Sequence, residues 1–433
     1  MYKEISKLIM YGNLDNNSIL SSMADIFNRF DNNLSSKEEL ITDIYTQIKR
    51  ILEVATDYGF DNNLWHNYLT YFLITNENPF SITCEKVGAN DGSVNIFARN
   101  DFKVFYNLFH YDFSEIEEKL GIDCFSIISN YKAIVKKELM YNKNVSEKVR
   151  ELSSRLERTK NENEFFDEVT EFYKAFGVGM FGLNKAFRIS SDEKDGLVFH
   201  PINNMDKVVL DDLIGYEIQK QKLVENTENF VQGRKANNAL LFGDSGTGKS
   251  TSIKAIVNQY YDQGLRMIEI YKHQFKDLSA IIAQVKNRNY RFIIYMDDLS
   301  FEEFEIEYKY LKAVIEGGLE KKPDNVLIYA TSNRRHLIRE TFSDKEEVRE
   351  DMHTSDTVQE KLSLYARFGV SIYFGAPGKK EFQHIVVSLA EKNGITMHEE
   401  TLLAEANKWE LAHGGLSGRT AQQFINYLLG KQE

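Results

Sequence analysis

The chain has 433 residues, of which 42% are hydrophobic and 27% charged, with only 4 prolines and a formal net charge of −12. This composition is typical of a folded, helix-rich protein of two or three domains and excludes a disordered chain. The acidic balance does not favour a protein that coats nucleic acid, although a local basic patch would still allow such a contact.

The sequence also predicts a compartment. No stretch approaches the roughly 18 consecutive apolar residues of a membrane helix, and the N-terminus lacks the apolar region of an export signal. The two cysteines, Cys84 and Cys124, have no histidines at metal-ligand spacing, which indicates buried thiols in a reducing compartment. We therefore expect a cytoplasmic protein with no membrane segment.

Residues 1–189 predict a mainly helical N-terminal domain. One helix follows Ser35 or Ser36, either of which can cap it, and its apolar residues recur at spacings of three and four: Leu40, Ile44, Ile48 and Ile51. Another is expected to end at Gly177 in a left-handed cap. Residues 81–101 contain an Asn-Asp-Gly turn and favour a small hairpin. No chemical motif emerges, so the default expectation is a domain that binds a protein partner.

A formal GxGxxG runs from Gly177 to Gly182. A dinucleotide fingerprint needs a strand before it, whereas a helix is expected here, so we interpret this segment as a flexible elbow between domains. The polar composition that begins at SSDEKDG predicts a linker over 190–205.

Residues 206–376 alternate strand and helix signals. Short apolar runs at 238–243, 266–271, 291–297, 325–333 and 369–375 are separated by helical segments. This pattern predicts an α/β domain with a parallel sheet flanked by helices on both faces. Residues 377–433 predict a small helical lid.

The strongest motif is GDSGTGKS, which lies between a predicted strand and a predicted helix. In this context the backbone N–H groups and the helix N-terminus hold phosphate oxygens, Lys249 reaches the outer phosphates, and the Ser250 hydroxyl is a magnesium ligand. The predicted nucleotide-binding residues of this loop are Gly243, Asp244, Ser245, Gly246, Thr247, Gly248, Lys249, Ser250 and Thr251.

Two aspartates follow the predicted strand FIIYM. Asp297 is placed to hold magnesium together with Ser250, and Asp298 is the candidate for orienting the attacking water. Nucleotide hydrolases most often keep a glutamate at the second position. Because aspartate is one methylene shorter, Asp298 would need an intervening water or a shifted backbone.

From residue 206 onward, the order of these motifs resembles the AAA+ branch of P-loop ATPases. The resemblance implies that DDLIGYE lies near the adenine, with Ile214 and Tyr216 as contacts. It implies that Asn333, after the next strand, is the sensor 1 residue that helps to position water. Adenine specificity itself follows from this resemblance alone.

Two arginines extend the resemblance. Arg367, expected between a helix and the last strand, is similar to the arginine finger that reaches a neighbouring subunit, although a surface salt bridge is the alternative. Arg419, at the start of a lid helix, is similar to the sensor 2 arginine. The motifs resemble an uncharacterised bacterial AAA+ family, domain of unknown function 815, with features of replication initiators and helicase loaders.

These residues predict a slow, Mg²⁺-dependent ATPase that forms a homo-oligomer and acts on an unknown protein partner. Asp298 in place of glutamate, and the lack of an unfoldase-type pore loop, leave open a switch or loader that binds ATP with little hydrolysis. A kinase on the same phosphate loop is the third alternative, and it would leave Asn333, Arg367 and Arg419 without a role.

Overall fold

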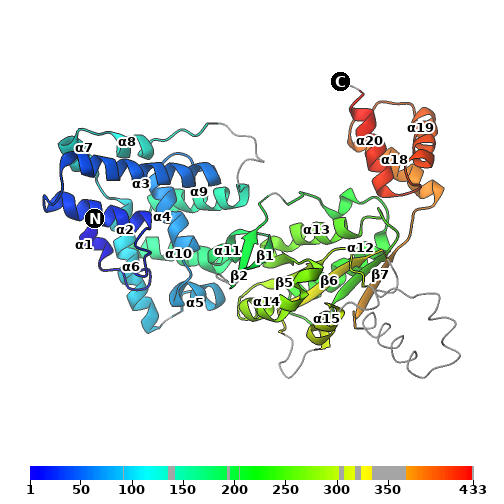
Figure 1. Ribbon diagram of the computed structural model, residues 1–433, viewed down its shortest axis with the longest axis horizontal. Helices are drawn as coiled ribbons and strands as arrows, with labels where there is room; N and C mark the ends of the chain where they lie inside the picture. Colours follow the sequence, from blue (N-terminus) through cyan, green and yellow to red (C-terminus); the bar gives the residue numbers. More distant parts are fainter. Residues whose placement is uncertain are drawn as a thin grey trace. The chain divides into compact units, whose positions relative to one another are not determined.

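The computed structural model describes residues 1–90, 92–134, 142–192, 196–203, 205–301, 307–316, 323–333 and 367–431. The chain divides into two compact units, Met1–Asn184 and Lys185–Glu433, each with its own hydrophobic core. Figure 1 shows the first unit as helices only and the second as a sheet with helices around it. Among the described residues, no helix is long and apolar enough to cross a membrane.

The first unit buries an aromatic core between short helices. Trp65, Phe102, Phe105 and Phe165 are each at most 2% exposed. Both cysteines are free and buried in this unit, and burial raises the pKa of each thiol to about 11. The described helices are α1 (Tyr2–Ile5), α2 (Ile19–Asp31), α3 (Lys37–Tyr58), α4 (Leu64–Thr75), α5 (Pro79–Val87), α6 (Ser93–Phe109), α7 (Ser114–Leu120), α8 (Cys124–Ser129), α9 (Lys143–Glu157), α10 (Glu162–Phe176) and α11 (Gly179–Leu183).

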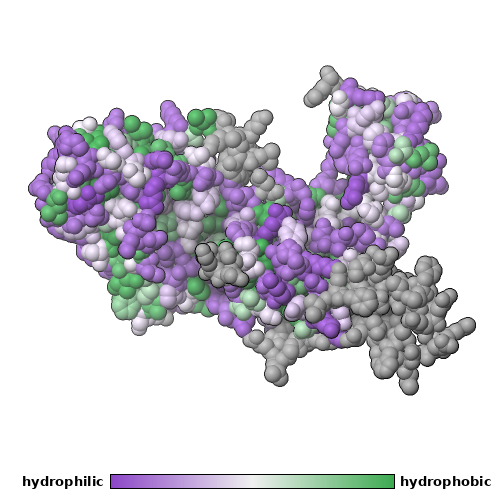
Figure 2. Space-filling view, viewed as in Figure 1, coloured by the Kyte–Doolittle hydropathy of each residue, from purple (hydrophilic) through white to green (hydrophobic). Residues whose placement is uncertain are grey.

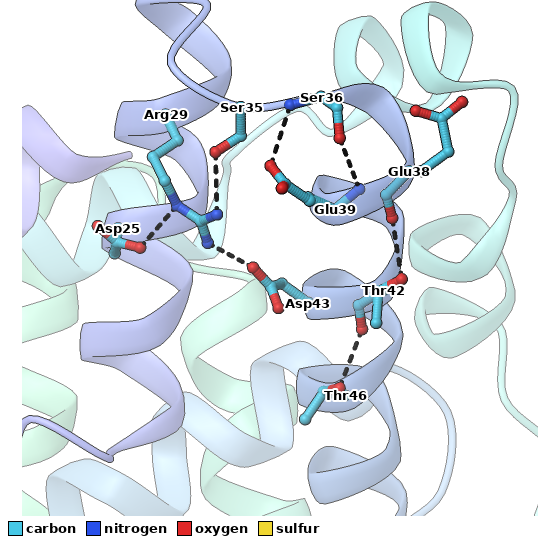
Figure 3. A network of polar contacts seen from close by, with 9 residues as sticks. All are labelled: Asp25, Arg29, Ser35, Ser36, Glu38, Glu39, Thr42, Asp43 and Thr46. Carbon is cyan, nitrogen blue, oxygen red and sulfur yellow. Dashed lines mark hydrogen bonds and ion pairs between the residues drawn. The ribbon is translucent and has the colours of Figure 1, made fainter.

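The start of α3 confirms the expected cap. Ser36 accepts a hydrogen bond from the Glu39 N–H, and the Glu39 carboxylate accepts one from the Ser36 N–H, which satisfies two otherwise unpaired donors. Beside this cap, Arg29 of α2 donates to Ser35 and forms ion pairs with Asp25 and Asp43 (Figure 3). These contacts tie α2 to the first turns of α3.

The hairpin expected over residues 81–101 is wrong. The segment instead belongs to α5 and α6. Asn78 caps α5 directly before Pro79, and the residues that α5 and α6 bury follow helical spacing, as Ala98, Phe102 and Phe105 show. Asn90 and Gly92 therefore lie between two helices, because turn residues mark a change of direction and not the type of element on either side.

Helix α10 ends before Gly177, as expected, but that glycine has φ 81° and ψ −168°, which is not the left-handed helical cap. The glycine-rich segment after it forms α11 and is largely buried, so the elbow interpretation is also wrong. Gly179 has φ 72°, a conformation that residues with a Cβ rarely adopt, which favours glycine there.

The second unit is built on a seven-stranded sheet in the order β2-β1-β4-β5-β6-β3-β7. All neighbouring pairs are parallel except β1 with β2, which confirms the predicted α/β class. The strands are β1 (Ala186–Asp192), β2 (Gly196–Pro201), β3 (Ala239–Gly243), β4 (Leu265–Glu269), β5 (Arg291–Met296), β6 (Val326–Ser332) and β7 (Val370–Phe374).

Strands β1 and β2 correct the linker expected over 190–205. Their residues pair antiparallel, and β1 also pairs with β4, so this segment extends the sheet. Phe187, Ile189 and Phe199 are buried, and the residue that follows each of them is polar and exposed. The rings of Phe187 and Phe199 are 6.3 Å apart. The polar composition did not reveal these strands, because successive side chains of a strand point to opposite faces and the polar residues are those that point outward.

Helices cover the sheet on both sides (Figure 1). Alternate strand residues, such as Leu241, Ile293 and Tyr329, share a core with α12 and α13, and the lid has a separate core of its own. The described helices are α12 (Glu217–Val231), α13 (Lys249–Tyr260), α14 (Leu278–Val285), α15 (Glu307–Glu316), α18 (Lys379–Lys392), α19 (Glu399–Ala412) and α20 (Gly418–Leu429), with short 3₁₀ turns at Leu210–Asp212, Tyr261–Gln263 and Lys272–Asp277.

Candidate functional site

A cavity of about 690 Å³ lies at the carboxyl ends of β3, β5 and β6. Its walls come from the loop after β3, the ends of β5 and β6, the segment before α12, and the lid helices α18 and α20. The lining includes most of the predicted site residues: Ile214, Tyr216, Ser245, Gly246, Thr247, Gly248, Lys249, Ser250, Thr251, Asp297, Asp298, Asn333 and Arg419.

The loop between β3 and α13 has the backbone expected of a phosphate cradle. Gly246 and Gly248 have φ values of 75° and 91°, which side chains with a Cβ rarely adopt. A Cβ on Gly248 would also lie 2.2 Å from a methyl group of Leu213. Close packing against the segment before α12 therefore needs glycine at this position.

Lys249 begins α13 and is 6% exposed. Its Nζ donates to the carbonyl oxygens of Gly243 and Asp244 at 2.9 and 2.6 Å. Burial lowers the pKa of Lys249, while the nearby carboxylates oppose that shift. The ammonium group is thus held inside the loop by two neutral acceptors, which phosphate oxygens could replace.

Asp297 lies directly after β5 and accepts hydrogen bonds at Oδ1 from the Ser250 and Thr331 hydroxyls, at 2.8 and 2.5 Å. Burial by itself would raise the pKa of Asp297, but these and other hydrogen bonds outweigh it and hold the pKa below its ordinary value. Asp297 is therefore a carboxylate at neutral pH.

Asp298 has a left-handed backbone, with φ 49°. Its carboxylate accepts a hydrogen bond from the Asn333 amide at 2.9 Å, and its N–H donates to the Thr331 hydroxyl at 2.9 Å. The structure thus brings Asn333 and Asp298 into direct contact, which the sequence analysis did not predict. Whether the shorter aspartate orients a water, directly or through a second water, stays a prediction.

The lid closes the cavity from the other side. The Arg419 N–H donates to the Gly246 carbonyl at 3.1 Å, and a Cβ on Gly246 would come within 3.2 Å of both Ser417 and Arg419. The charge of Arg419 is near enough to Lys249 to help lower the pKa of the lysine. A further ion pair joins Lys392 of α18 to Asp212 of the core.

Tyr216 and Ile214 both line the cavity. The Tyr216 hydroxyl donates to the Gly375 carbonyl at 2.8 Å, and its ring packs on Phe374 with centroids 5.3 Å apart. Tyr216 therefore also contacts the segment that connects β7 to the lid.

Three predicted residues do not line the cavity: Gly243, Asp244 and Arg367. Gly243 ends β3, where a Cβ would lie 2.2 Å from the Phe374 carbonyl oxygen. The Asp244 carboxylate accepts a hydrogen bond from the Ala376 N–H at 2.7 Å, so it connects the phosphate loop to the start of the lid.

Arg367 lies three residues before β7, and the helix expected before it lies outside the described residues. Because Val370 pairs with Ala239 and Phe374 with Gly243, Arg367 is at the opposite end of the parallel strands from the phosphate loop. Five strand residues at roughly 3.3 Å each place it ~16 Å or more from the cavity of its own chain.

Sequence reasoning missed several lining residues: Val208, Asp212, Leu213, Thr331, Ile385, Leu389, Gly418, Gln422 and Gln423. Two of them had a usable signal. Thr331 is the second-to-last residue of β6, two residues before Asn333 in the run predicted as a strand, where alternate residues face the same side. Gln422 lies about one helical turn after Arg419 in α20.

The residues present fit a nucleotide and a magnesium ion. The cavity is large enough for a cofactor-sized ligand. Among the described acidic residues that line the cavity, only Asp297 contacts a hydroxyl of the phosphate loop, namely that of Ser250. No group of three or more acidic, histidine or cysteine ligands occurs among the described residues.

The family described as "Protein of unknown function (DUF815)" matches residues 183–432, more than half of the chain. The chain belongs to the DUF815 family. The match covers nearly all of the sheet unit and the lid. In this part of the chain the phosphate loop follows β3, which lies between β6 and the edge strand β7, and the helical lid follows β7.

Solved structures similar to this DUF815 chain include two RuvB variants of Thermotoga maritima, at 17% and 18% identity with TM-scores of 0.35 and 0.36. Each match covers 52% of this chain and 65% or 66% of the RuvB chain, just under two thirds of its length. The FIGL-1 AAA domain in complex with ADP matches at 17% identity and TM-score 0.36, over 52% of this chain and 73% of that one. No curated protein matches the sequence.

Proposed function

We propose that this DUF815 protein binds Mg²⁺-ATP and hydrolyses it slowly to ADP and phosphate. The observation that carries the proposal is the convergence of Lys249, the Asp297–Ser250 pair, the Asp298–Asn333 pair and Arg419 on one cavity. Lys249 and Arg419 supply positive charge for phosphate oxygens, and Asp297 and Asp298 supply carboxylates for a metal ion and a water.

Each residue has a defined task in this proposal. Lys249 exchanges its two loop carbonyls for oxygens of the outer phosphates, and Arg419 approaches them from the lid. Asp298 takes a proton from the water that attacks the γ-phosphorus, while Asn333 holds the Asp298 carboxylate in place. Bound Mg²⁺, held by Ser250 and Asp297, would neutralise phosphate charge.

Arg367 supports assembly of several copies. It lies at the far end of β7 from the cavity of its own chain, which supports a role at the nucleotide of a neighbouring subunit. An arginine supplied in trans stabilises charge in the transition state of phosphoryl transfer. The proposed active form is therefore a homo-oligomer.

The helical N-terminal unit is proposed to bind the protein partner. Figure 2 shows apolar patches on its surface, and its exposed apolar side chains include Val87 at the end of α5 and Val94, Ile96 and Phe97 at the start of α6. Clusters of this kind on a folded protein commonly mark interaction surfaces.

One observation favours the second candidate function, an ATP-dependent switch with little hydrolysis. One carboxylate oxygen of Asp298 already accepts a hydrogen bond from Asn333, and the backbone of Asp298 is strained. Only the other oxygen of this short side chain is then left to orient water. In that case ATP binding would close the lid and drive assembly without turnover.

The test is phosphate release from ATP over a concentration series of the purified protein, beside Lys249→Ala, Asp298→Ala and Arg367→Ala. Arg234→Ala, at an exposed position in the same unit, is the matched control for loss of an arginine. The ATPase proposal expects the rate per subunit to rise with concentration and to fall in all three variants, but not in the control.

Tight ATP binding by the wild type, with release no faster than that of Asp298→Ala, would instead support the switch. A wild type that binds no ATP would contradict both candidate functions.

A further inference from the structure

Thr331 contacts both acidic residues of the site through one hydroxyl. It lies in β6, is 2% exposed and also lines the cavity. Its Oγ1 donates to Asp297 Oδ1 at 2.5 Å and accepts from the Asp298 N–H at 2.9 Å. A hydroxyl has a single hydrogen to donate. Because an ionised carboxylate can only accept and a backbone N–H can only donate, the Thr331 hydroxyl must donate to Asp297 and accept from Asp298.

The Thr331 backbone adds a third contact, since its carbonyl accepts from the Leu299 N–H at 2.6 Å. Thr331 thus binds three consecutive residues, 297 to 299, where the chain leaves β5. The middle one, Asp298, has φ 49°, a conformation that persists only when its surroundings determine it. Here those surroundings are Thr331 on the backbone and Asn333 on the side chain.

We propose that Thr331 is the positioning residue that aligns the two carboxylates, and this inference rests on the ATPase function proposed above. Its hydroxyl turns Asp297 toward Ser250, and its contact with the Asp298 N–H keeps the left-handed backbone that compensates for the shorter aspartate. Magnesium affinity and water orientation therefore depend on a side chain that acts through Asp297 and Asp298.

Two conservative variants distinguish a role of the Thr331 hydroxyl from a role of Thr331 in packing. Thr331→Val keeps the shape and loses the hydroxyl, whereas Thr331→Ser keeps the hydroxyl and loses a methyl group. If the hydroxyl is what matters, serine preserves function and valine does not. If packing is what matters, valine is the better tolerated of the two.

The experiment measures binding of N-methylanthraniloyl-ATP in EDTA and during a Mg²⁺ titration, together with kcat and KM for ATP. For Thr331→Val we expect unchanged affinity in EDTA, a half-saturating Mg²⁺ concentration raised roughly tenfold, and kcat lowered roughly tenfold or more, as for loss of a hydrogen bond to a charged group. Thr331→Ser should stay within about threefold of wild type in each quantity.

Thr227→Val is the matched control. Thr227 is fully buried in α12, and its hydroxyl bonds to the Leu223 carbonyl and the Tyr329 hydroxyl, away from the cavity lining. It should lose stability without changing the Mg²⁺ requirement. If Thr331→Val is insoluble, Thr331→Ala against Thr331→Ser gives the same contrast.

Two failures remain distinguishable. An active wild type whose Thr331→Val variant keeps the wild-type Mg²⁺ requirement and kcat overturns the positioning role alone. A wild type with neither Mg²⁺-dependent binding nor phosphate release overturns the proposed function and this inference with it.

Discussion

Asp298 shows how the chemistry of a single residue depends on its backbone. Its φ of 49° is tolerated by aspartate and asparagine better than by longer side chains, because their short polar groups bond locally. The carboxylate then meets the Asn333 amide at 2.9 Å. The aspartate at the position of the usual glutamate is thus matched to an unusual backbone conformation, and a glutamate there would strain that backbone.

This match predicts slower phosphate release in two variants, for a different reason in each. Asp298→Asn should keep the left-handed backbone and bind ATP within about twofold of wild type, while phosphate release falls about 100-fold, since only proton acceptance is lost. Asp298→Glu should also release phosphate at least about tenfold more slowly, because the longer side chain strains this backbone. Single-turnover assays of phosphate release, with ATP affinity measured separately, test both predictions. A glutamate variant faster than wild type would show that side-chain length limits the reaction.

At the scale of elements, the phosphate loop and the lid are in direct contact. Arg419 donates its N–H to the Gly246 carbonyl, and Asp244 and Tyr216 hold the segment between β7 and α18 through Ala376 and Gly375. A change in the loop therefore reaches the lid through backbone contacts. Lid position and nucleotide occupancy are expected to be coupled for this reason.

The contact predicts the effect of a single added methyl group. Gly246→Ala would put a Cβ about 3.0 Å from the Ser417 Oγ and 3.1 Å from the Arg419 Cβ. We expect it to push α20 from the loop and to weaken ATP binding roughly tenfold or more, since the arginine and one wall of the cavity move away.

Gly264→Ala is the control for that measurement. Gly264 has a similarly strained φ of 91°, but nothing lies within 4 Å of its missing Cβ. It should cost stability, on the order of 1 kcal/mol, without changing ATP affinity. Equal losses of ATP affinity in both variants would mean that backbone strain, and not the lid contact, is responsible.

At the scale of the whole molecule, the two units can be followed separately. The chain has two tryptophans, Trp65 in the helical unit and Trp409 in the lid. Trp65 is 2% exposed in the first core, so its fluorescence reports unfolding of that unit. A Trp409→Phe background therefore isolates the helical unit without separating it from the rest of the chain.

In that background we predict that His66 makes the helical unit sensitive to acid. Burial lowers the pKa of His66 below 6.5, with Glu157 opposing this shift and His110 adding to it. Its Nε2 contacts the Phe109 carbonyl at 2.7 Å. The folded unit therefore disfavours the protonated ring, and the free energy of unfolding should fall as pH drops below about 6.5.

Urea titrations monitored by Trp65 between pH 5 and 8 check this sign. His66→Gln should flatten the pH dependence in the range near pH 6, because glutamine can still donate to the Phe109 carbonyl without titrating. If the free energy of unfolding depends on pH equally in the variant and the parent, the acid sensitivity belongs to other groups.

The sequence by itself determined the features that local chemistry encodes. The glycines and lysine of GDSGTGKS, the five apolar strand runs and the helical lid predicted an α/β P-loop fold and most of the residues around the cavity. The Ser36 cap and the helix after it were predicted as well. Each of these depends on residues close together along the chain, where spacing alone carries the information.

The tertiary structure decided what depends on residues far apart. It turned the expected hairpin into α5 and α6 and the expected linker into β1 and β2, because core contacts select between conformations that turn residues and polarity leave open. It also paired Thr331 with Asp297 and Asp298 across two strands, and placed Arg367 away from its own cavity. Strand register and the order of strands in the sheet fix those distances, and no single segment of the sequence contains them.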